Sequence, residues 1–339
     1  MEKITWKRPG LTVTRMGFGC LPIQRLSVPD AASLVRRAFD AGVTFFDTAR
    51  AYSDSEEKVG RALAGLRGQV ILATKTAAKT ADGFFSDLET SLKALNTSCI
   101  DVYQFHNPDF VPRPGGADGL YDAALRAKAE GKIRCIGISQ HSLERAREAI
   151  ESGLYDTLQY PFNHLATDAD VDMVQRCGQA GMGFIAMKGL SGGLVTDAAL
   201  PFAFLRTFAH AVPIWGIQRE GELDQFIALE KNPPALDEAL RARIEADRRE
   251  LAGSFCRGCG YCLPCPAGIP IDMANRMTQL LQRSPTERWL AADWQERMAH
   301  IEQCTRCGAC AARCPYGLKP FDTLPGHLKY YREAVARQA

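Results

Sequence analysis

Three short apolar segments in the first third of the chain each end on an ionisable side chain. These side chains are Asp47, Lys75 and His106, and the phenol of Tyr52 follows shortly after the first of them. Each residue alone is more often structural, as a helix cap, a solvated cation or an isolated histidine. Ionisable groups at the carboxyl ends of successive strands are, however, typical of the catalytic face of a parallel barrel. We therefore treat the four side chains as one candidate site for proton-transfer chemistry.

The segments that carry these residues belong to a regular alternation of strands and helices. A hairpin over residues 3–15, with its turn at Pro9–Gly10, precedes this alternation. A doubly wound open sheet is the competing architecture, but no G-x-G-x-x-G turn follows the first strand. The pattern therefore predicts a (β/α)8 TIM barrel. Its strands are expected at 16–20, 43–46, 70–75, 101–106, 133–139, 157–160, 184–187 and 212–217.

Several short motifs in this part of the chain carry a family resemblance. They read M-G-F-G-C at 16–20, G-V-T-F-F-D-T-A-R-A-Y at 42–52, A-T-K-T at 73–76, D-V-Y-Q-F-H-N-P at 101–108, I-G-I-S at 136–139 and L-Q-Y-P-F-N at 158–163. With these motifs, residues 1–232 resemble the aldo–keto reductase family. The resemblance implies a barrel that binds a nicotinamide cofactor without a Rossmann fold. It also implies a catalytic set of Asp47, Tyr52, Lys75 and His106.

The chemistry implied for this set is the interconversion of a carbonyl and an alcohol. Hydride transfer develops negative charge on the carbonyl oxygen, and a free phenol with a pKa of about 10 is a weak acid at neutral pH. We expect Lys75 to lower the pKa of Tyr52, so that the phenol acts as both acid and base. Asp47 would keep Lys75 charged and in place. His106 would orient the carbonyl oxygen by donating a hydrogen bond to it.

The resemblance also implies contacts to the cofactor from later strands and loops. Ser139 and Gln159 would bind the carboxamide of the nicotinamide. Met187 would pack on the ring, where the family usually has an aromatic residue. The cofactor phosphates would be bound by Gly192, Gly193, Gln218 and Arg219. Taken alone, the paired glycines are more often a simple turn. Arg219 favours NADP(H) over NAD(H).

Cysteines are concentrated at the C-terminal end of the chain, where eight of the 12 follow Phe255. They form C-x2-C-x2-C-x2-C-P over 256–266 and C-x2-C-x2-C-x3-C-P over 304–315, and similar residues follow each run. This internal duplication resembles a bacterial-type ferredoxin with two [4Fe–4S] clusters. Zinc is the less favoured alternative, because a structural zinc site normally needs only two C-x-x-C pairs.

In such ferredoxins the fourth cysteine of each run binds the cluster of the other run. The resemblance therefore implies one cluster held by Cys256, Cys259, Cys262 and Cys314. It implies a second cluster held by Cys304, Cys307, Cys310 and Cys265. The first run has one residue fewer than the usual pattern before its last cysteine.

These features predict three parts: a reductase barrel over 1–232, a helical linker over 233–255 and a small α-helical ferredoxin-like dicluster domain over 256–339. A charged amphipathic helix is expected at 236–251, ended by Gly253. Between the cysteine runs, Ser284-Pro285-Thr286-Glu287 predicts the start of another helix, which would extend to about Ile301.

Composition excludes several classes of function. The net charge is +2, and no run of Lys and Arg is dense enough for a nucleic-acid surface. No apolar stretch is long enough for a membrane span, and the N-terminus lacks the apolar core of a signal peptide. We therefore expect a cytoplasmic protein with neither a nucleic-acid nor a membrane partner.

Two redox modules on one chain allow three functions. The barrel would be an NADP-linked oxidoreductase for a small carbonyl or alcohol, with clusters that are structural or relay electrons to a redox partner protein. Alternatively, the clusters would drive one-electron radical chemistry on the barrel without nicotinamide. In the third case, an idle barrel would belong to an electron carrier in a complex. The four intact residues favour an enzyme, although nicotinamide transfers two electrons, a cluster transfers one, and no flavin motif bridges them.

Overall fold

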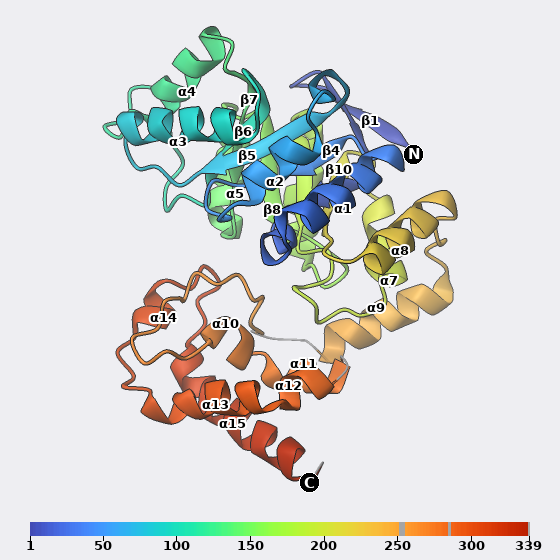
Figure 1. Ribbon diagram of the computed structural model, residues 1–339, viewed down its shortest axis with the longest axis vertical. Coiled ribbons are helices and arrows are strands. Elements are labelled where there is room, and N and C mark those ends of the chain that lie inside the picture. The colour runs from blue at the N-terminus through green and yellow to red at the C-terminus, as the bar shows by residue number, and fades with distance from the viewer. Residues whose placement is uncertain (251–254, 284–285, 338–339) are drawn as a thin grey trace. The chain divides into compact units, whose positions relative to one another are not determined.

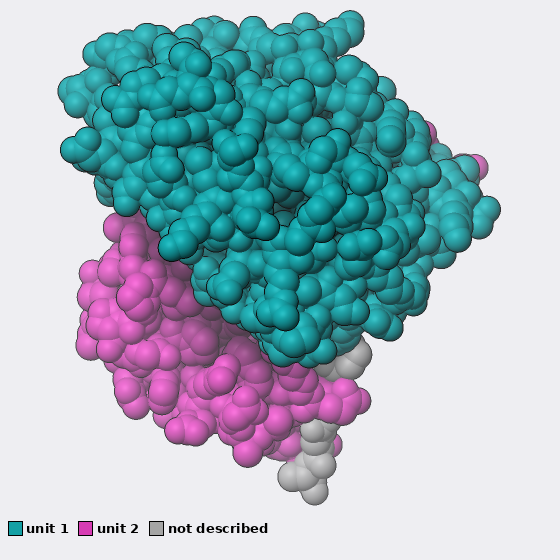
Figure 2. Space-filling view, turned by 45° about the horizontal axis from the view of Figure 1, so that its top comes forward, with its two compact units in different colours: residues 1–189, 199–237 teal, residues 190–198, 238–339 magenta. Residues whose placement is uncertain are grey.

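The computed structural model describes residues 1–250, 255–283 and 286–337. The chain forms two compact units, coloured separately in Figure 2. The first comprises residues 1–189 and 199–237, and the second comprises residues 190–198 and 238–339. Segment 190–198, which we expected within the barrel, therefore belongs to the cysteine-rich unit. An ion pair between Asp197 of this segment and Arg243, 2.6 Å apart, links the segment to the rest of the second unit.

Eight strands close into a barrel in the first unit, in the order β10-β3-β4-β5-β6-β7-β8-β9. Every neighbouring pair is parallel, which confirms the predicted TIM barrel. The strands are β3 (Gly17–Gly19), β4 (Phe45–Asp47), β5 (Ile71–Thr76), β6 (Ile100–His106), β7 (Ile133–Ser139), β8 (Thr157–Pro161), β9 (Gly183–Met187) and β10 (Ala211–Gly216).

An α-helix follows each barrel strand along the chain (Figure 1). Four of these helices begin at a serine or threonine whose side chain accepts a backbone N–H, which satisfies a donor of the first turn. The helices are α1 (Val28–Asp40), α2 (Ser55–Ala62), α3 (Ala81–Ala94), α4 (Leu120–Ala129), α5 (Leu143–Ser152), α6 (Asp168–Gln179), α7 (Ala199–Arg206) and α8 (Glu220–Lys231), with short 3-10 turns η1 (Pro22–Arg25) and η2 (Arg67–Gln69).

The predicted N-terminal hairpin is present as β1 (Lys3–Trp6) and β2 (Leu11–Thr14). Trp6 packs edge-on against Phe45 and shares a buried cluster with side chains near the starts of several barrel strands. Its indole N–H donates to the carbonyl oxygen of His210 at 3.0 Å. The hairpin thus fills the amino-terminal end of the barrel, and the carboxyl ends of the strands are left for the candidate site.

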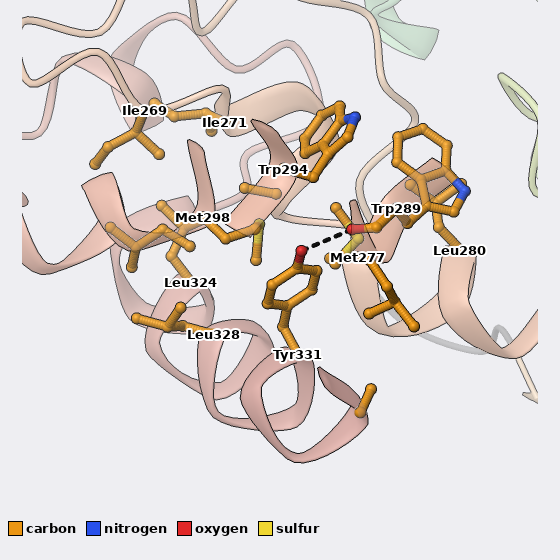
Figure 3. Close-up of a cluster of buried hydrophobic side chains, with 14 of the residues drawn as sticks. Ile269, Ile271, Met277, Leu280, Trp289, Trp294, Met298, Leu324, Leu328 and Tyr331 are labelled. Atoms are coloured by element: carbon orange, nitrogen blue, oxygen red, sulfur yellow. Dashed lines mark hydrogen bonds between the residues drawn. The ribbon is translucent and has the colours of Figure 1, made fainter. Parts of the chain in front are cut away.

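In the described residues of the second unit, all regular structure is helical. A large apolar core holds these helices together (Figure 3). Trp289, Trp294 and Met298 meet Leu324 and Tyr331 there, and the Tyr331 hydroxyl donates to the Trp289 carbonyl oxygen at 2.7 Å. The elements are α9 (Glu238–Glu250), α10 (Ile271–Ala274), α11 (Met277–Arg283), α12 (Glu287–Leu290), α13 (Ala292–Ala299), η3 (His300–Gln303), α14 (Ala309–Ala312) and α15 (Pro320–Ala336).

The single helix predicted between the cysteine runs is wrong in its described part. Ser284 and Pro285 lie outside the described residues, as does the predicted helix end at Gly253. The chain is extended at Ala291, which separates α12 from α13. Residues five apart on one continuous helix point about 140° apart. The break allows Trp289 and Trp294 to pack together in the core, with ring centroids 5.0 Å apart.

Within residues 1–250, 255–283 and 286–337, no helix combines the length and the apolar character that crossing a bilayer requires.

Candidate functional site

Asp47 and Lys75 end neighbouring barrel strands and form a buried ion pair. Lys75 Nζ lies 2.7 Å from Asp47 Oδ1 and donates to the Thr48 carbonyl oxygen at 2.6 Å. Their side chains are only 2% and 1% exposed, respectively. Burial raises the pKa of Asp47, and the ammonium group of Lys75 opposes this shift.

The other carboxylate oxygen of Asp47 contacts a glutamine that sequence analysis did not single out. Gln104 Nε2 donates to Asp47 Oδ2 at 3.3 Å and to Gln159 Oε1 at 2.9 Å. Gln104 precedes His106 by two residues in β6, so both side chains lie on the same face of the strand. A polar residue two positions before a predicted catalytic residue, in a buried strand, is the signal that would have identified it.

Buried hydroxyl groups fix the loop that carries Tyr52. Thr48 Oγ1 donates to Ser55 Oγ, and Ser55 Oγ donates to the Cys20 carbonyl oxygen, each at 2.9 Å. The Tyr52 N–H donates to the Ala49 carbonyl oxygen at 3.0 Å, and the Tyr52 carbonyl oxygen accepts the Ser55 N–H at 2.8 Å. Tyr52 is therefore held between the end of β4 and the start of α2.

The ring of Tyr52 lies beside both Lys75 and His106. Lys75 Nζ is 5.3 Å from the ring centroid, and the imidazole centroid of His106 is 5.8 Å away in an edge-on arrangement. The structure thus brings the four residues predicted as catalytic together at the carboxyl ends of β4, β5 and β6.

The expected lowering of the pKa of Tyr52 is wrong for this geometry. Burial raises this pKa, and the charge of Asp47 and the thiol of Cys20 add to the increase. Lys75 faces the aromatic ring, and its charge is matched by Asp47 at 2.7 Å. Tyr52 is therefore a neutral phenol, which is the protonation state of a proton donor.

His106 is also neutral in this environment. Burial lowers its pKa to about 3, and the neighbouring positive charge of Lys75 contributes in the same direction. A neutral imidazole retains one N–H donor, which suits the predicted hydrogen bond to a carbonyl oxygen.

Three of the predicted nicotinamide contacts lie on β7, β8 and β9, the three strands that follow β6 around the barrel. Strand register pairs His106 with Ser139 and Ser139 with Gln159. Gln159 Nε2 lies 3.7 Å from Met187 Sδ and 3.4 Å from Asp47 Oδ1. A hydroxyl, an amide and a thioether are thus grouped beside the four-residue site, and this donor set fits a carboxamide-bearing ring.

The predicted phosphate contacts Gln218 and Arg219 follow β10. Their backbone N–H groups both donate to the carboxylate of Glu222, and these bonds stabilise the first turn of α8. The Arg219 side chain is 70% exposed, so its guanidinium is accessible to an anion. Gln218 Oε1 accepts a hydrogen bond from Arg25 at 3.3 Å.

The remaining two predicted contacts, Gly192 and Gly193, belong to the second unit, unlike the other five. The Gly193 N–H donates to the Leu190 carbonyl oxygen at 2.8 Å, as in an ordinary turn. Their contact with a pyrophosphate stays a prediction.

The eight C-terminal cysteines surround two cavities in the second unit. Each cavity is lined by three cysteines of one run and the fourth cysteine of the other, which is the grouping expected from the ferredoxin resemblance. Cys256, Cys259, Cys262 and Cys314 line the first cavity, and Cys304, Cys307, Cys310 and Cys265 line the second. All eight are free thiols, and four thiolates around a cavity are the donor set of a [4Fe–4S] cluster.

Hydrogen bonds tie the two cysteine runs together. Arg313, which precedes Cys314, donates to the carbonyl oxygens of Cys262, Leu263 and Pro264, each at 2.9 Å. Ile271 lines both cavities. Among the described residues, no three His, Cys, Asp or Glu side chains converge on the position of a single metal ion. Sulfurs that bind the corners of a cubane lie farther apart than those that bind one ion.

We expect the imidazole of His106 to remain neutral between about pH 8 and pH 5 in cofactor-free protein. Proton NMR with assignment by His106→Gln measures this. Because the folded pKa lies below the unfolded value of about 6.5, His106 stabilises the fold above that pH, and the contribution is lost as the pH falls. A His106 titration midpoint near 6.5 would contradict the desolvated environment.

Comparison with known sequences supports both units. The description "Aldo/keto reductase family" matches residues 15–204, and "4Fe-4S dicluster domain" matches residues 255–319. The chain is 37% identical over 186 residues to aldo-keto reductase YhdN of Bacillus subtilis (strain 168), covering 48% of this chain and 54% of that protein. The chain spans little more than half the length of the curated relatives it matches.

Solved structures share the barrel fold. An aldo-keto reductase from Klebsiella pneumoniae in complex with NADPH has a TM-score of 0.64 and 22% identity, covering 73% of this chain and 96% of its own. Aldo-keto reductase AKR11C1 from Bacillus halodurans, in its holo form, has a TM-score of 0.64 and 20% identity over the same shares.

The aldo/keto reductase match extends over more than half of the chain and covers barrel strands β3 to β9 and the four-residue site. The chain therefore belongs to the aldo/keto reductase family, and it carries a C-terminal 4Fe-4S dicluster domain.

Proposed function

We propose that the chain is an oxidoreductase that interconverts a small carbonyl compound and its alcohol with NADP(H). We further propose that two [4Fe–4S] clusters in the second unit relay single electrons to or from a redox partner protein. The observation that carries the first proposal is the grouping of Tyr52 with His106 and the buried Asp47–Lys75 pair.

When bound, the nicotinamide supplies a hydride to the carbonyl carbon. Side chains of the barrel protonate and orient the carbonyl oxygen. Neutral Tyr52 donates its proton to that oxygen, and neutral His106 orients it through an N–H. The Asp47–Lys75 pair holds the Tyr52 ring in place, and the phenolate that Tyr52 becomes regains a proton from solvent. In the alcohol-oxidising direction, the same groups act in reverse.

Two observations support NADP(H) as the cofactor. The Klebsiella pneumoniae protein of the same fold was solved with NADPH. Arg219 presents a guanidinium that is 70% exposed after β10 and lies 4.0 Å from the carboxylate of Glu222, where it would bind the additional phosphate that distinguishes NADP from NAD. Ser139, Gln159 and Met187 would hold the nicotinamide, and Gly192, Gly193 and Gln218 would contact the rest of the cofactor.

The cavities support the two clusters and their crossed ligation. Each is ringed by four cysteines drawn from both runs. Cys307 of the second cavity is exposed, which favours electron exchange with another protein at that position. Cys310 of the same cavity is buried, so the site is anchored in the core of the unit.

Tyr52→Phe removes the proposed proton donor and keeps the ring. We expect turnover to fall by at least about a hundredfold because general acid catalysis of this kind contributes about 10²–10⁴-fold. NADPH binding, measured by fluorescence titration, should be unchanged. Tyr155→Phe is the matched control, since its hydroxyl donates to the Pro112 carbonyl oxygen away from the site. Near-normal turnover of Tyr52→Phe on a panel of aldehydes and ketones would remove Tyr52 from the mechanism.

The relay is tested without a partner protein. Under anaerobic conditions and before any carbonyl substrate is added, NADPH is expected to bleach the visible absorbance of the reconstituted clusters, because its hydride carries two electrons, one for each cluster, and a proton is released. Dithionite serves as the positive control. Clusters that stay oxidised while the carbonyl is reduced would contradict the relay and leave the reductase intact.

Crossed ligation is tested by single Cys→Ser variants. We expect Cys256→Ser and Cys314→Ser to lose the same EPR signal, and Cys304→Ser and Cys265→Ser to lose the other, each with about half of the iron. Cys177→Ser, on α6 of the barrel, should retain all of it. If Cys314→Ser instead lost the same EPR signal as Cys304→Ser, each cysteine run would bind its own cluster.

A further inference from the structure

Arg276 is a charged side chain in an unusual environment. It lies between α10 and α11 of the second unit and is only 2% exposed. A buried guanidinium is almost always paired with an anion, because removing a charge from water is costly. Within the described residues, however, no carboxylate forms an ion pair with Arg276.

The contacts of Arg276 leave one of its three nitrogen atoms without a hydrogen-bond partner among the described residues. Nη1 donates to the Ser191 carbonyl oxygen and Nη2 donates to the Gly192 carbonyl oxygen, both at 3.0 Å. Nη2 also lies 3.4 Å from Met273 Sδ. Nε is buried and has no hydrogen-bond partner. Both Nη atoms of the guanidinium therefore hold the 191–192 backbone, while Nε has no partner among the described residues. Asp272 interacts electrostatically with the guanidinium but forms no ion pair with it.

The guanidinium lies against the loop of the first cysteine run. A Cβ atom added to Gly258 would come within 2.7 Å of Arg276 Cζ, and one added to Gly192 would come within 2.7 Å of Nη1. Both glycines have positive φ angles, +59° and +67°, so two glycines together make room for this side chain. Arg276 also interacts electrostatically with Cys256 and Cys259, two of the cysteines that line the first cavity.

We propose that Arg276 is the buried counter-charge of the first cluster and, at the same time, fixes the Ser191–Gly192 backbone beside it. This inference rests on the proposed function, since it requires that Cys256, Cys259, Cys262 and Cys314 bind a [4Fe–4S] cluster. A cluster bound by four thiolates is anionic, so it supplies an anionic partner for a guanidinium that forms no ion pair among the described residues. Reduction adds one electron to this anion, and a buried cation beside it stabilises the reduced form.

Among the described residues, no buried arginine lines the second cavity. Its two arginines, Arg306 and Arg313, are exposed, and the side chain of Arg306 is 58% exposed and paired with Asp322. A solvated, paired charge has a weak effect on a neighbouring site. Arg306→Met is therefore a matched control for Arg276→Met, because both remove one guanidinium beside one cavity.

The experiment is an EPR-monitored redox titration of the reconstituted full-length protein, in which an electrode with mediators supplies the electrons. The two cluster signals are assigned with Cys256→Ser and Cys304→Ser. For Arg276→Met we expect the midpoint potential of the first cluster to become more negative, with at least a tenfold change in its reduction equilibrium, or about 59 mV. Arg276→Lys, which keeps the charge, should show less than half of that shift. Arg306→Met should leave the first cluster unchanged.

Hydrogen exchange reports on the second role of Arg276. The amide protons of Gly193 and Val195, which donate to the Leu190 carbonyl oxygen, should exchange faster in Arg276→Met. An unchanged midpoint in Arg276→Met at full iron content would overturn the assignment. If Arg276→Met fails to bind iron, the Arg276→Lys variant provides the test. A first-cluster midpoint equal to that of the wild-type protein would support the role of the charge. Loss of iron from Arg276→Lys, which keeps the charge, would overturn the assignment. Absence of both clusters from the wild-type protein would instead contradict the proposed function.

Discussion

Lys75 Nζ lies 2.7 Å from Asp47 Oδ1 in a part of the barrel that solvent barely reaches. An ion pair in this position is costly to form and still more costly to break, because either partner alone would be a buried, uncompensated charge. Gln104 and Gln159 satisfy the carboxylate further, and Thr48 accepts from the ammonium group. The orientation of the Tyr52 ring, which lies over Lys75, depends on this network.

The same principle of charge compensation applies to the second unit. Two cavities lie beside its core, and Ile271 lines both of them. Each cavity is also lined by cysteines from both runs. The thiolates proposed to bind clusters would add negative charge, and Arg276 provides a buried positive charge beside the first cavity. Arg276 also holds the Ser191–Gly192 carbonyl groups, so one side chain joins the first cysteine run to the loop that follows β9.

The barrel and the grouping of Asp47, Lys75 and His106 with Tyr52 were predictable, because strands and helices alternate regularly and three of these side chains stand near strand ends. The crossed cysteine grouping was predictable from the resemblance of the two runs to a bacterial-type ferredoxin. Other features depend on contacts that spacing does not encode. The sequence position of Gln104, two residues before His106, is a signal, but its hydrogen bond to Asp47 is known only from the structure. The break at Ala291 likewise reflects the packing of two tryptophans. The raised pKa of Tyr52 results from burial and from Asp47, which the presence of Lys75 near the end of a neighbouring strand could not indicate.

The central claim is that Asp47 and Lys75 act as one unit that supports the phenol of Tyr52. A double-mutant cycle on kcat/KM with Asp47→Asn, Lys75→Met and the combined variant tests it most directly. We predict strong non-additivity: the double variant should lose little more activity than the worse single variant, because either change already destroys the pair. Losses that multiply, so that the double variant falls by the product of the two single effects, would contradict the account.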